Sequence, residues 1–224
     1  AHELRNPIQP ILGLAEVMLS IKNLDVIQQE ELLRIIVNNA KKLHFLTNNL
    51  LDIARIDENL FSLELQELDI VQLANDAIKE IRSQINGKKI KIILKCNDNS
   101  LNVIGDKIRL NQVFLNLINN SIKYTNEGDI VVSIKRSSSE NSKSNHDGNN
   151  DNVALVQIID KGVGIPPTIL QKLFSKFTKG SKTGTGLGLF ICKNIVEGHG
   201  GKIWAQNNTD KGATFSFTIP LKKQ

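Results

Sequence analysis

The 224-residue sequence is poor in cysteine and in aromatic residues, and each shortage excludes a class of function. Its two cysteines, Cys96 and Cys192, form no metal-binding or redox spacing, which suits a reducing cytosol. One tryptophan and one tyrosine are too few for the aromatic platforms typical of RNA-binding proteins. The net charge of +5 is spread along the chain, which favours solubility over nucleic-acid binding.

Long apolar runs are also missing. No run approaches the ~18 to 20 residues that a membrane span needs, and no signal peptide is recognisable. We therefore expect no direct membrane contact and a place in the cytoplasmic portion of a protein. Because the chain begins at Ala1 inside an apparent helix, we expect it to be the C-terminal piece of a longer protein.

The first third of the chain has the pattern of a helical hairpin. Apolar residues fall at helical spacing between Leu4 and Leu19, where Pro7 and Pro10 predict a bend. A second helix is predicted from Val26 to about Asp57, with apolar steps of three and four and a seam wide enough for a four-helix bundle. The seam consists of Leu32, Leu33, Ile36, Ala40, Leu43, Leu46, Thr47, Leu50, Ile53 and Ala54. Because one chain supplies two helices, we predict a two-fold homodimer.

The heptad pattern ends near residue 60, so we predict one domain over residues 1–60 and a second over residues 61–224. The second domain mixes strands and helices. Predicted strands are Leu63–Leu68, Lys89–Lys95, Asn102–Gly105, Asp129–Arg136, Val153–Ile159, Lys202–Gln206 and Ala213–Pro220. Predicted helices are a segment capped by Asp69 and ending near Asn86, then Asp106–Tyr124, Pro167–Ser175 and Gly186–Gly198. Ser137–Asn152 is of low complexity and reads as a mobile excursion between two strands.

The helix predicted from Asp106 to Tyr124 has an unusual polar face. Asparagine is a poor helix former, yet Asn116 and Asn120 fall on one side together with Lys123. A local rule broken repeatedly indicates a functional face, although a solvated face in an asparagine-rich chain is the alternative. Amide oxygens suit Mg²⁺ held together with nucleotide phosphates, and a lysine can meet a phosphate oxygen.

Two glycine clusters follow. Asp160 ends a strand and leads into the turn Gly162-Val163-Gly164, and residues 184–188 open a helix as Gly-Thr-Gly-Leu-Gly. Glycine lets the backbone approach a bulky anion, and amides at a helix start suit phosphate. The Asp160 carboxylate can accept a hydrogen bond from an exocyclic amine such as that of adenine. The polar segment between the clusters, Lys176–Thr183, is interpreted as a lid.

One histidine stands out from the other three. His2 lies beside the apolar stripe of the first helix, with Glu3 next to it and Asn6 one turn on. The alternative for any single histidine is a surface position. We assign that alternative to His44, His146 and His199.

In this order the motifs resemble the catalytic core of sensor histidine kinases of two-component systems. Residues 2–7 look like the phosphoacceptor box, 106–125 the N box, 160–164 the G1 box, 174–177 the F box and 184–188 the G2 box. The resemblance implies an α+β chain: a dimerisation and histidine-phosphotransfer hairpin, then a two-layer α/β sandwich shared with gyrase, Hsp90-type chaperones and mismatch-repair ATPases.

The resemblance also implies residue roles. His2 would take the γ-phosphoryl group of ATP, Glu3 would orient the imidazole or accept its proton, and Asn6 would orient water when a response regulator is dephosphorylated. Asn120 would coordinate Mg²⁺ with support from Asn116. The other nucleotide-binding positions would be Lys123, Tyr124, Asp160, Gly162, Gly164, Ile165, Phe177, Gly184, Thr185, Gly186, Leu187 and Gly188. The phosphoryl group would then pass to an aspartate of a response regulator receiver domain.

Two alternatives to an autokinase remain. A degenerate kinase could bind ATP and signal as a dimeric scaffold, but the intact His2, Asn120 and Asp160 weigh against it. A related anti-sigma serine kinase would lack the hairpin that carries His2. Two departures from the family pattern are Ser121, where alanine is usual, and a short lid from Phe177 to Gly184, which predicts faster nucleotide exchange.

Overall fold

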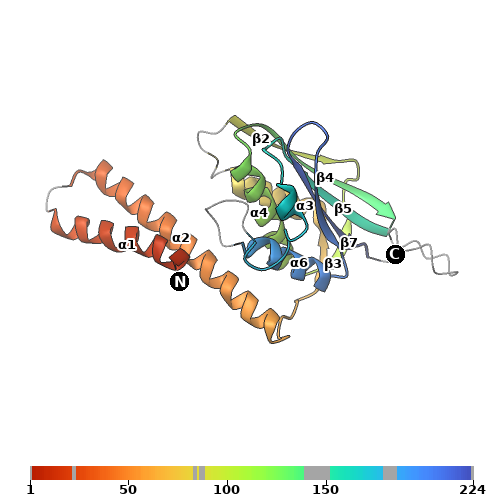
Figure 1. Cartoon of the computed structure of the whole chain (residues 1–224), viewed down its shortest axis with the longest axis horizontal. Coiled ribbons are helices and arrows are strands. Elements are labelled where there is room, and N and C mark those ends of the chain that lie inside the picture. Colours follow the sequence, from red (N-terminus) through yellow and green to blue (C-terminus); the bar gives the residue numbers. More distant parts are fainter. Residues whose placement is uncertain are drawn as a thin grey trace. The chain divides into compact units, whose positions relative to one another are not determined.

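A computed structural model describes residues 2–21, 24–82, 85, 89–138, 152–178 and 186–222, apart from the side chains of His2, Glu3 and Ser138 (Figure 1). The described residues up to Phe61 form one compact unit, and those from Ser62 onward form a second. The predicted excursion at 137–152 lies mostly outside the described residues, as does the predicted lid from residue 179 onward.

The first unit is an antiparallel helical hairpin of α1 (His2–Ser20) and α2 (Val26–Asp57). Helix α1 runs without interruption through Pro7 and Pro10, so neither proline ends it. Helix α2 begins with a capping box: the Asp25 carboxylate accepts from the Gln28 amide at 2.7 Å, and the Gln28 side chain accepts from the Asp25 amide at 3.4 Å. This cap satisfies amides that the first helical turn leaves without partners.

The apolar seam of α2 is divided between two environments. Leu32, Ile36 and Leu43 are half-buried in the hairpin, whereas Leu33 and Leu50 remain 48% and 42% exposed. Helix α1 likewise leaves Leu12 57% exposed. A single hairpin therefore covers only part of the apolar surface that its heptad pattern provides.

The second unit contains two sheets. Strands β1 (Gln66–Asp69) and β3 (Asn102–Gly105) form an antiparallel pair. The larger sheet has the order β2-β4-β5-β7-β6. Its strands are β2 (Lys89–Cys96), β4 (Glu127–Ser138), β5 (Asn152–Ile159), β6 (Ile203–Asn207) and β7 (Ala213–Pro220). Strand β2 pairs parallel to β4, and the other neighbours are antiparallel.

Helices α3 (Ile70–Arg82), α4 (Lys107–Tyr124) and α6 (Gly188–Gly198) lie on one side of this sheet (Figure 1). Phe114 of α4 meets Phe217 of β7 edge to face, with ring centroids 5.5 Å apart, and both are fully buried. The core-facing positions of α3, at steps of three and four from Ile70 to Ile81, are buried as predicted. The unit is therefore the two-layer α/β sandwich that the resemblance implied.

The structure corrects several predicted boundaries. Strand β4 spans Glu127–Ser138 rather than Asp129–Arg136, and α6 begins at Gly188 rather than Gly186. Strand β1 begins at Gln66 rather than Leu63, because the Glu64 amide donates to the Asp106 carboxylate at 3.0 Å instead of joining a ladder. Helix α3 ends at Arg82, whose guanidinium donates to the Ile92 carbonyl at 2.6 Å. The helix predicted over residues 167–175 is only α5 (Pro167–Leu170), and turns follow it.

His199 also departs from its prediction as a surface residue, because it is 8% exposed. Its Nδ1 lies 2.7 Å from the Ile195 carbonyl, which can only accept, so Nδ1 carries the proton. Its Nε2 then accepts from the Asp106 amide at 2.8 Å. Asp106 also caps α4 by accepting from the Ile108 and Arg109 amides, both at 3.0 Å. His199 thus joins the end of α6 to the start of α4.

We predict that His199→Ala lowers the free energy of unfolding by about 2–4 kcal/mol, since it removes a buried side chain and leaves the Asp106 amide without its acceptor. Urea unfolding followed by circular dichroism would measure the change. His44→Ala, at an exposed position of α2, should change stability by less than about 0.5 kcal/mol. Equal effects of the two substitutions would contradict the linking role of His199.

Candidate functional site

The site is built around Asp160, which follows β5 and is 3% exposed. Its amide donates to the Ala213 carbonyl at 2.9 Å. Its Oδ1 accepts from the amides of Gly162 at 2.8 Å and Ala213 at 3.1 Å. Its Oδ2 lies 3.5 Å from the Ser121 hydroxyl, a long hydrogen bond. One carboxylate oxygen therefore holds two strong backbone donors, and the other retains capacity for a donor from a ligand.

Burial raises the pKa of Asp160, and the opposing hydrogen bonds from Gly162, Ala213 and Ser121 only partly offset it. The carboxylate is thus costly to ionise while it lacks a further partner. A ligand N–H placed at Oδ2 would relieve that cost. The exocyclic amine of adenine is a donor of this kind.

The loop after Asp160 lies directly against the end of α4. A Cβ on Gly162 would stand 2.5 Å from the Tyr124 carbonyl oxygen, a distance that only glycine avoids. The Val163 amide donates to the same carbonyl at 3.3 Å. Lys123 places its Nζ 5.1 Å from the Tyr124 ring centroid. The structure therefore brings the predicted residues Tyr124 and Gly162 together beside Asp160, and Lys123 directly precedes Tyr124 on α4.

A second group of predicted residues meets about two turns earlier on α4. Asn116 is 8% exposed; its side chain lies beside the Cys192 thiol, and its Nδ2 makes no hydrogen bond of good geometry among the described residues. A Cβ on Gly188 would lie 3.4 Å from Oδ1 of Asn116, so the start of α6 packs closely on the Asn116 side chain. Asn120 is half-exposed on the same helix. A buried amide without a good hydrogen bond, beside a helix start, is a position where a polar ligand group would gain a partner.

The start of α6 is suited to an anion. Leu187, at the N-cap, has no polar side chain with which to cap the first-turn amides, and the first turn contains no acidic residue. Helix N-termini attract negative charge through these amides and the helix dipole. Together with Asn116, this end of the site fits a phosphate-bearing group.

The donor set also bears on a metal. Within the described residues, no group of three or more His, Cys, Asp or Glu side chains is placed to hold an ion. Amide oxygens such as those of Asn116 and Asn120 are hard ligands, which suit Mg²⁺ when phosphate oxygens complete its shell.

Burial raises the pKa of the Cys192 thiol to about 12, so that cysteine stays protonated.

Other predicted positions are placed as follows. Phe177 is 65% exposed with φ +61°, and a Cβ on Gly186 would lie 2.6 Å from its carbonyl carbon. Ile165 is 9% exposed. Asn6 is exposed on α1 in the first unit. The side chains of His2 and Glu3, and all of Gly184 and Thr185, lie outside the described residues.

The sequence alone did not point to three contributors. Ser121 counted only as a departure from the family pattern, yet its hydroxyl approaches Asp160. Asn207 and Asn208 bind the loop from Asp160 to Ile165. Their one local signal was a pair of asparagines between a strand and a turn, which is common in loops.

Comparison with known proteins agrees with this geometry. The family of "Histidine kinase-, DNA gyrase B-, and HSP90-like ATPase" matches residues 105–223. The "His Kinase A (phospho-acceptor) domain" matches residues 1–59. The chain is 34% identical over 239 residues to hybrid signal transduction histidine kinase C of Dictyostelium discoideum, covering 99% of this chain and 18% of that protein. It is 32% identical over 237 residues to sensor protein SrrB of Staphylococcus aureus, covering 98% and 36%.

Solved structures show the same likeness. Full-length ShkA in complex with AMPPNP has a TM-score of 0.71 and 25% identity, covering all of this chain and 45% of that one. Histidine kinase ThkA in complex with response regulator protein TrrA has a TM-score of 0.65 and 27% identity, covering 99% and 60%.

The sandwich and its site define an ATPase domain of the histidine kinase, gyrase and HSP90 type. With the phosphoacceptor domain before it, the chain belongs to the sensor histidine kinases and corresponds to their catalytic core. It spans 18% and 36% of the length of the two relatives named above. Of the helices in the described part of the chain, none is both long enough and apolar enough to cross a membrane.

The raised pKa of Asp160 predicts how stability depends on pH. The folded state holds this proton more tightly than the unfolded state, so the resulting stabilisation is present below the ordinary pKa and is lost as pH rises through the folded pKa. Asp160→Asn keeps the acceptor for Gly162 and Ala213 and removes the charge. We expect this variant to be more stable than wild type at about pH 7–8, with the difference shrinking toward about pH 4.

Urea unfolding at a series of pH values would test this, with Asp210→Asn in the exposed turn before β7 as the matched control. A stability difference for Asp160→Asn that is independent of pH, or that grows as pH falls, would refute the assignment.

Proposed function

We propose that the chain is an ATP-dependent protein-histidine autokinase. The observation that carries the proposal is that two residues of α4 contact the two ends of the candidate site: Ser121 approaches Asp160, and Asn116 approaches the start of α6. These two residues are five positions apart, or about 7.5 Å along the helix axis. The amine-accepting carboxylate of Asp160 thus lies beside α4 at Ser121, and the anion-accepting start of α6 lies beside the same helix at Asn116. An adenine nucleotide presents an amine and phosphates at opposite ends.

The base would bind at Asp160, with Gly162, Gly164 and Ile165 lining its approach, and the phosphates would lie toward Gly186, Leu187 and Gly188. Lys123 and Tyr124 would contact the phosphate and base sides. Phe177, Gly184 and Thr185 complete the proposed nucleotide-binding set. The AMPPNP complex of the related ShkA supports an adenine nucleotide as the ligand.

We further propose that Asn120, supported by Asn116, would hold Mg²⁺ together with phosphate oxygens. When bound, the ion would neutralise negative charge on the phosphates. The support is the chemistry of the amide oxygens, which are hard ligands of the kind that Mg²⁺ binds.

The transfer step joins the proposed domains, residues 1–60 and 61–224. His2 would attack the γ-phosphorus with one ring nitrogen, forming a P–N bond as the bond to the ADP oxygen breaks. Glu3 would orient the other ring nitrogen or take its proton, which keeps the attacking nitrogen nucleophilic. Holding donor and acceptor in line supplies much of the rate enhancement in such transfers.

The phosphoryl group would then move to an aspartate of a response regulator receiver domain. The complex of the related ThkA with response regulator protein TrrA supports this class of partner. Asn6, exposed one turn after His2, would orient a water molecule that hydrolyses the aspartyl phosphate of the regulator and releases inorganic phosphate. We propose that the chain works as the cytoplasmic portion of a sensor, with no nucleic-acid partner.

We propose that the hairpin forms a homodimer. Its exposed apolar residues are more than one hairpin can cover, and pairing two hairpins into four helices would bury them. Leu12 of α1 and Leu33 of α2 are examples, at 57% and 48% exposed.

Incubation with γ-labelled ATP and Mg²⁺ should place an acid-labile label on the wild-type chain. His2→Gln should abolish the label while ATP affinity, measured by calorimetry, stays within about threefold, because His2 belongs to the acceptor. Asp160→Asn should lose ATP affinity by about 100-fold or more, because an amide donor would then face the adenine amine. Removing Mg²⁺ with EDTA should abolish the label.

His44→Gln, at an exposed position of α2, is the matched control and should keep the label. An unlabelled wild-type chain, or label that persists on His2→Gln, would contradict the proposed autokinase activity.

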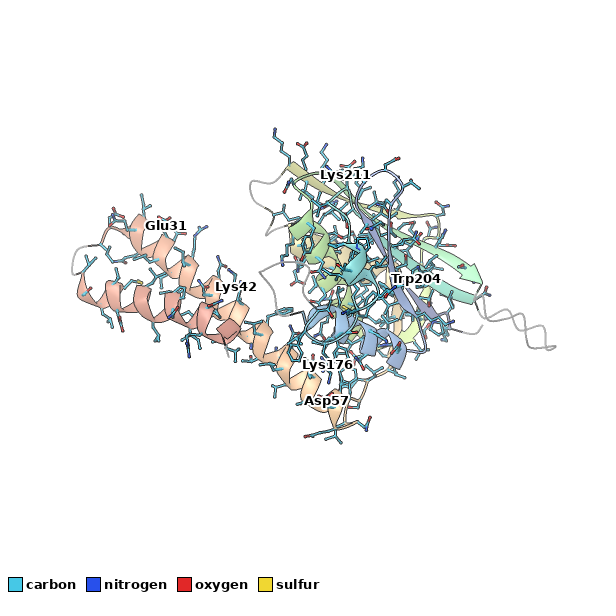
Figure 2. The ribbon with its side chains drawn as sticks, viewed as in Figure 1. Glu31, Lys42, Asp57, Lys176, Trp204 and Lys211 are labelled. Carbon is cyan, nitrogen blue, oxygen red and sulfur yellow. The ribbon has the colours of Figure 1, made fainter. Side chains whose placement is uncertain are left out.

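Sedimentation should find a wild-type dimer. Replacing Leu12 and Leu33 together by glutamate should weaken dimerisation by about 100-fold or more, because each charge would enter an apolar seam. Lys42→Glu, at an exposed position of α2 that Figure 2 labels, is the charge-matched control and should leave the dimer intact. A wild-type monomer, or equal effects of the two changes, would exclude this interface.

A further inference from the structure

Two consecutive asparagines fasten the loop of Asp160 to the neighbouring hairpin. Strand β6 ends at Asn207 and β7 begins at Ala213, so Asn208 opens the turn between them. Figure 2 labels Trp204 on β6 and Lys211 within this turn. Neither asparagine is part of the nucleotide-binding set proposed above, and each directs its side-chain amide to residues 160–165.

Asn208 binds the backbone of Asp160. Its Nδ2 donates to the Asp160 carbonyl at 2.9 Å and to the Lys211 carbonyl at 3.2 Å. Its Oδ1 accepts from the Thr214 hydroxyl at 2.6 Å. The backbone amide of Asn208 donates to the Gly212 carbonyl at 3.0 Å, and this hydrogen bond closes the turn. The side chain thus bridges both sides of the β6–β7 turn and Asp160.

Asn207 binds the other end of the same loop. Its Oδ1 accepts from the Ile165 amide at 2.7 Å, and its Nδ2 donates to the Ile165 carbonyl at 2.9 Å. One side chain therefore pairs with Ile165 at two points, as a neighbouring strand would. Only a residue with both an amide donor and a carbonyl acceptor can do this at the same length.

The turn itself is shaped to bring the two segments together. Gly212 has φ +89°, and a Cβ there would collide with the Asp160 carbonyl oxygen. This close approach lets the Ala213 amide reach Oδ1 of Asp160 at 3.1 Å. The orientation of the carboxylate is consequently set from the β6–β7 turn as well as from its own loop.

We propose that Asn207 and Asn208 are positioning residues for the nucleotide base. They hold loop 160–165 in the conformation that directs Oδ2 of Asp160 to the adenine amine and keeps Ile165 beside the base. The proposal rests on the proposed nucleotide site and adds to it two residues that act through Asp160 and Ile165. Without these bonds the loop would also sample conformations that do not bind the nucleotide. The apparent affinity for ATP would then fall in proportion to the fraction of molecules whose loop is in the binding conformation.

The first test needs no nucleotide. Amide hydrogen exchange in the ligand-free chain should show faster exchange at Ile165 in Asn207→Ala, because its acceptor is gone, and faster exchange at Gly162 in Asn208→Ala, because the loop end is released. Gln206→Ala, an exposed position just before the pair, is the matched control and should leave both amides unchanged. Unchanged exchange in both asparagine variants would overturn the proposal.

The second test measures ATP binding by calorimetry and the kinetics of autophosphorylation. Each alanine variant should bind ATP about tenfold more weakly, which corresponds to the loss of one or two hydrogen bonds. The KM for ATP should rise by a similar factor, while kcat at saturating ATP stays within about threefold. Asn208→Asp retains the acceptor for Thr214 but loses the donor to Asp160, so it should bind ATP as weakly as Asn208→Ala.

The outcomes separate this proposal from the proposed function. Wild type that fails to bind ATP would remove the nucleotide site itself. Wild type that binds, with variants of equal affinity, would overturn the positioning role alone. A purely structural role would instead lower the melting temperature of the ligand-free variants and reduce kcat and affinity together, and that result would also overturn the proposal.

Discussion

The burial of one carboxylate organises the second unit. Asp160 has little solvent, so its charge must be met by backbone amides, and these come from its own loop and from the start of β7. As a result, the end of β5, the β6–β7 turn and the end of α4 are in contact around Asp160. Among the described residues, Oδ2 has only a long bond to Ser121, so the carboxylate still has an acceptor for a ligand.

Helix α4 is held in place at both of its ends. Asp106 caps its start and receives support from His199, while its last turn meets the loop of Asp160. Asn116, midway, is a poor helix former with an amide that makes no hydrogen bond of good geometry among the described residues. An asparagine at this position costs helix stability, but a helix holds a ligand-binding side chain more rigidly than a loop does.

Periodic patterns predicted elements well where packing follows the sequence. Helix α2 and strands β3 and β7 have the predicted bounds, since apolar spacing reports directly on which residues face a core. Predictions failed where a distant partner intervened: Glu64 binds Asp106 rather than a strand, and His199 is buried between two helices. None of these partners is adjacent in sequence, so no local pattern could report them.

The sequence by itself determined the order of chemistry-bearing motifs, the family, and the residue types of the proposed nucleotide site, because those signals are local runs of glycine, asparagine and acid. Only the tertiary structure decided how Asp160 is held. Asn207 and Asn208 lie more than forty positions from the loop that they bind. An asparagine amide can donate and accept in many settings, and its partner is set by the path of the chain rather than by its neighbours.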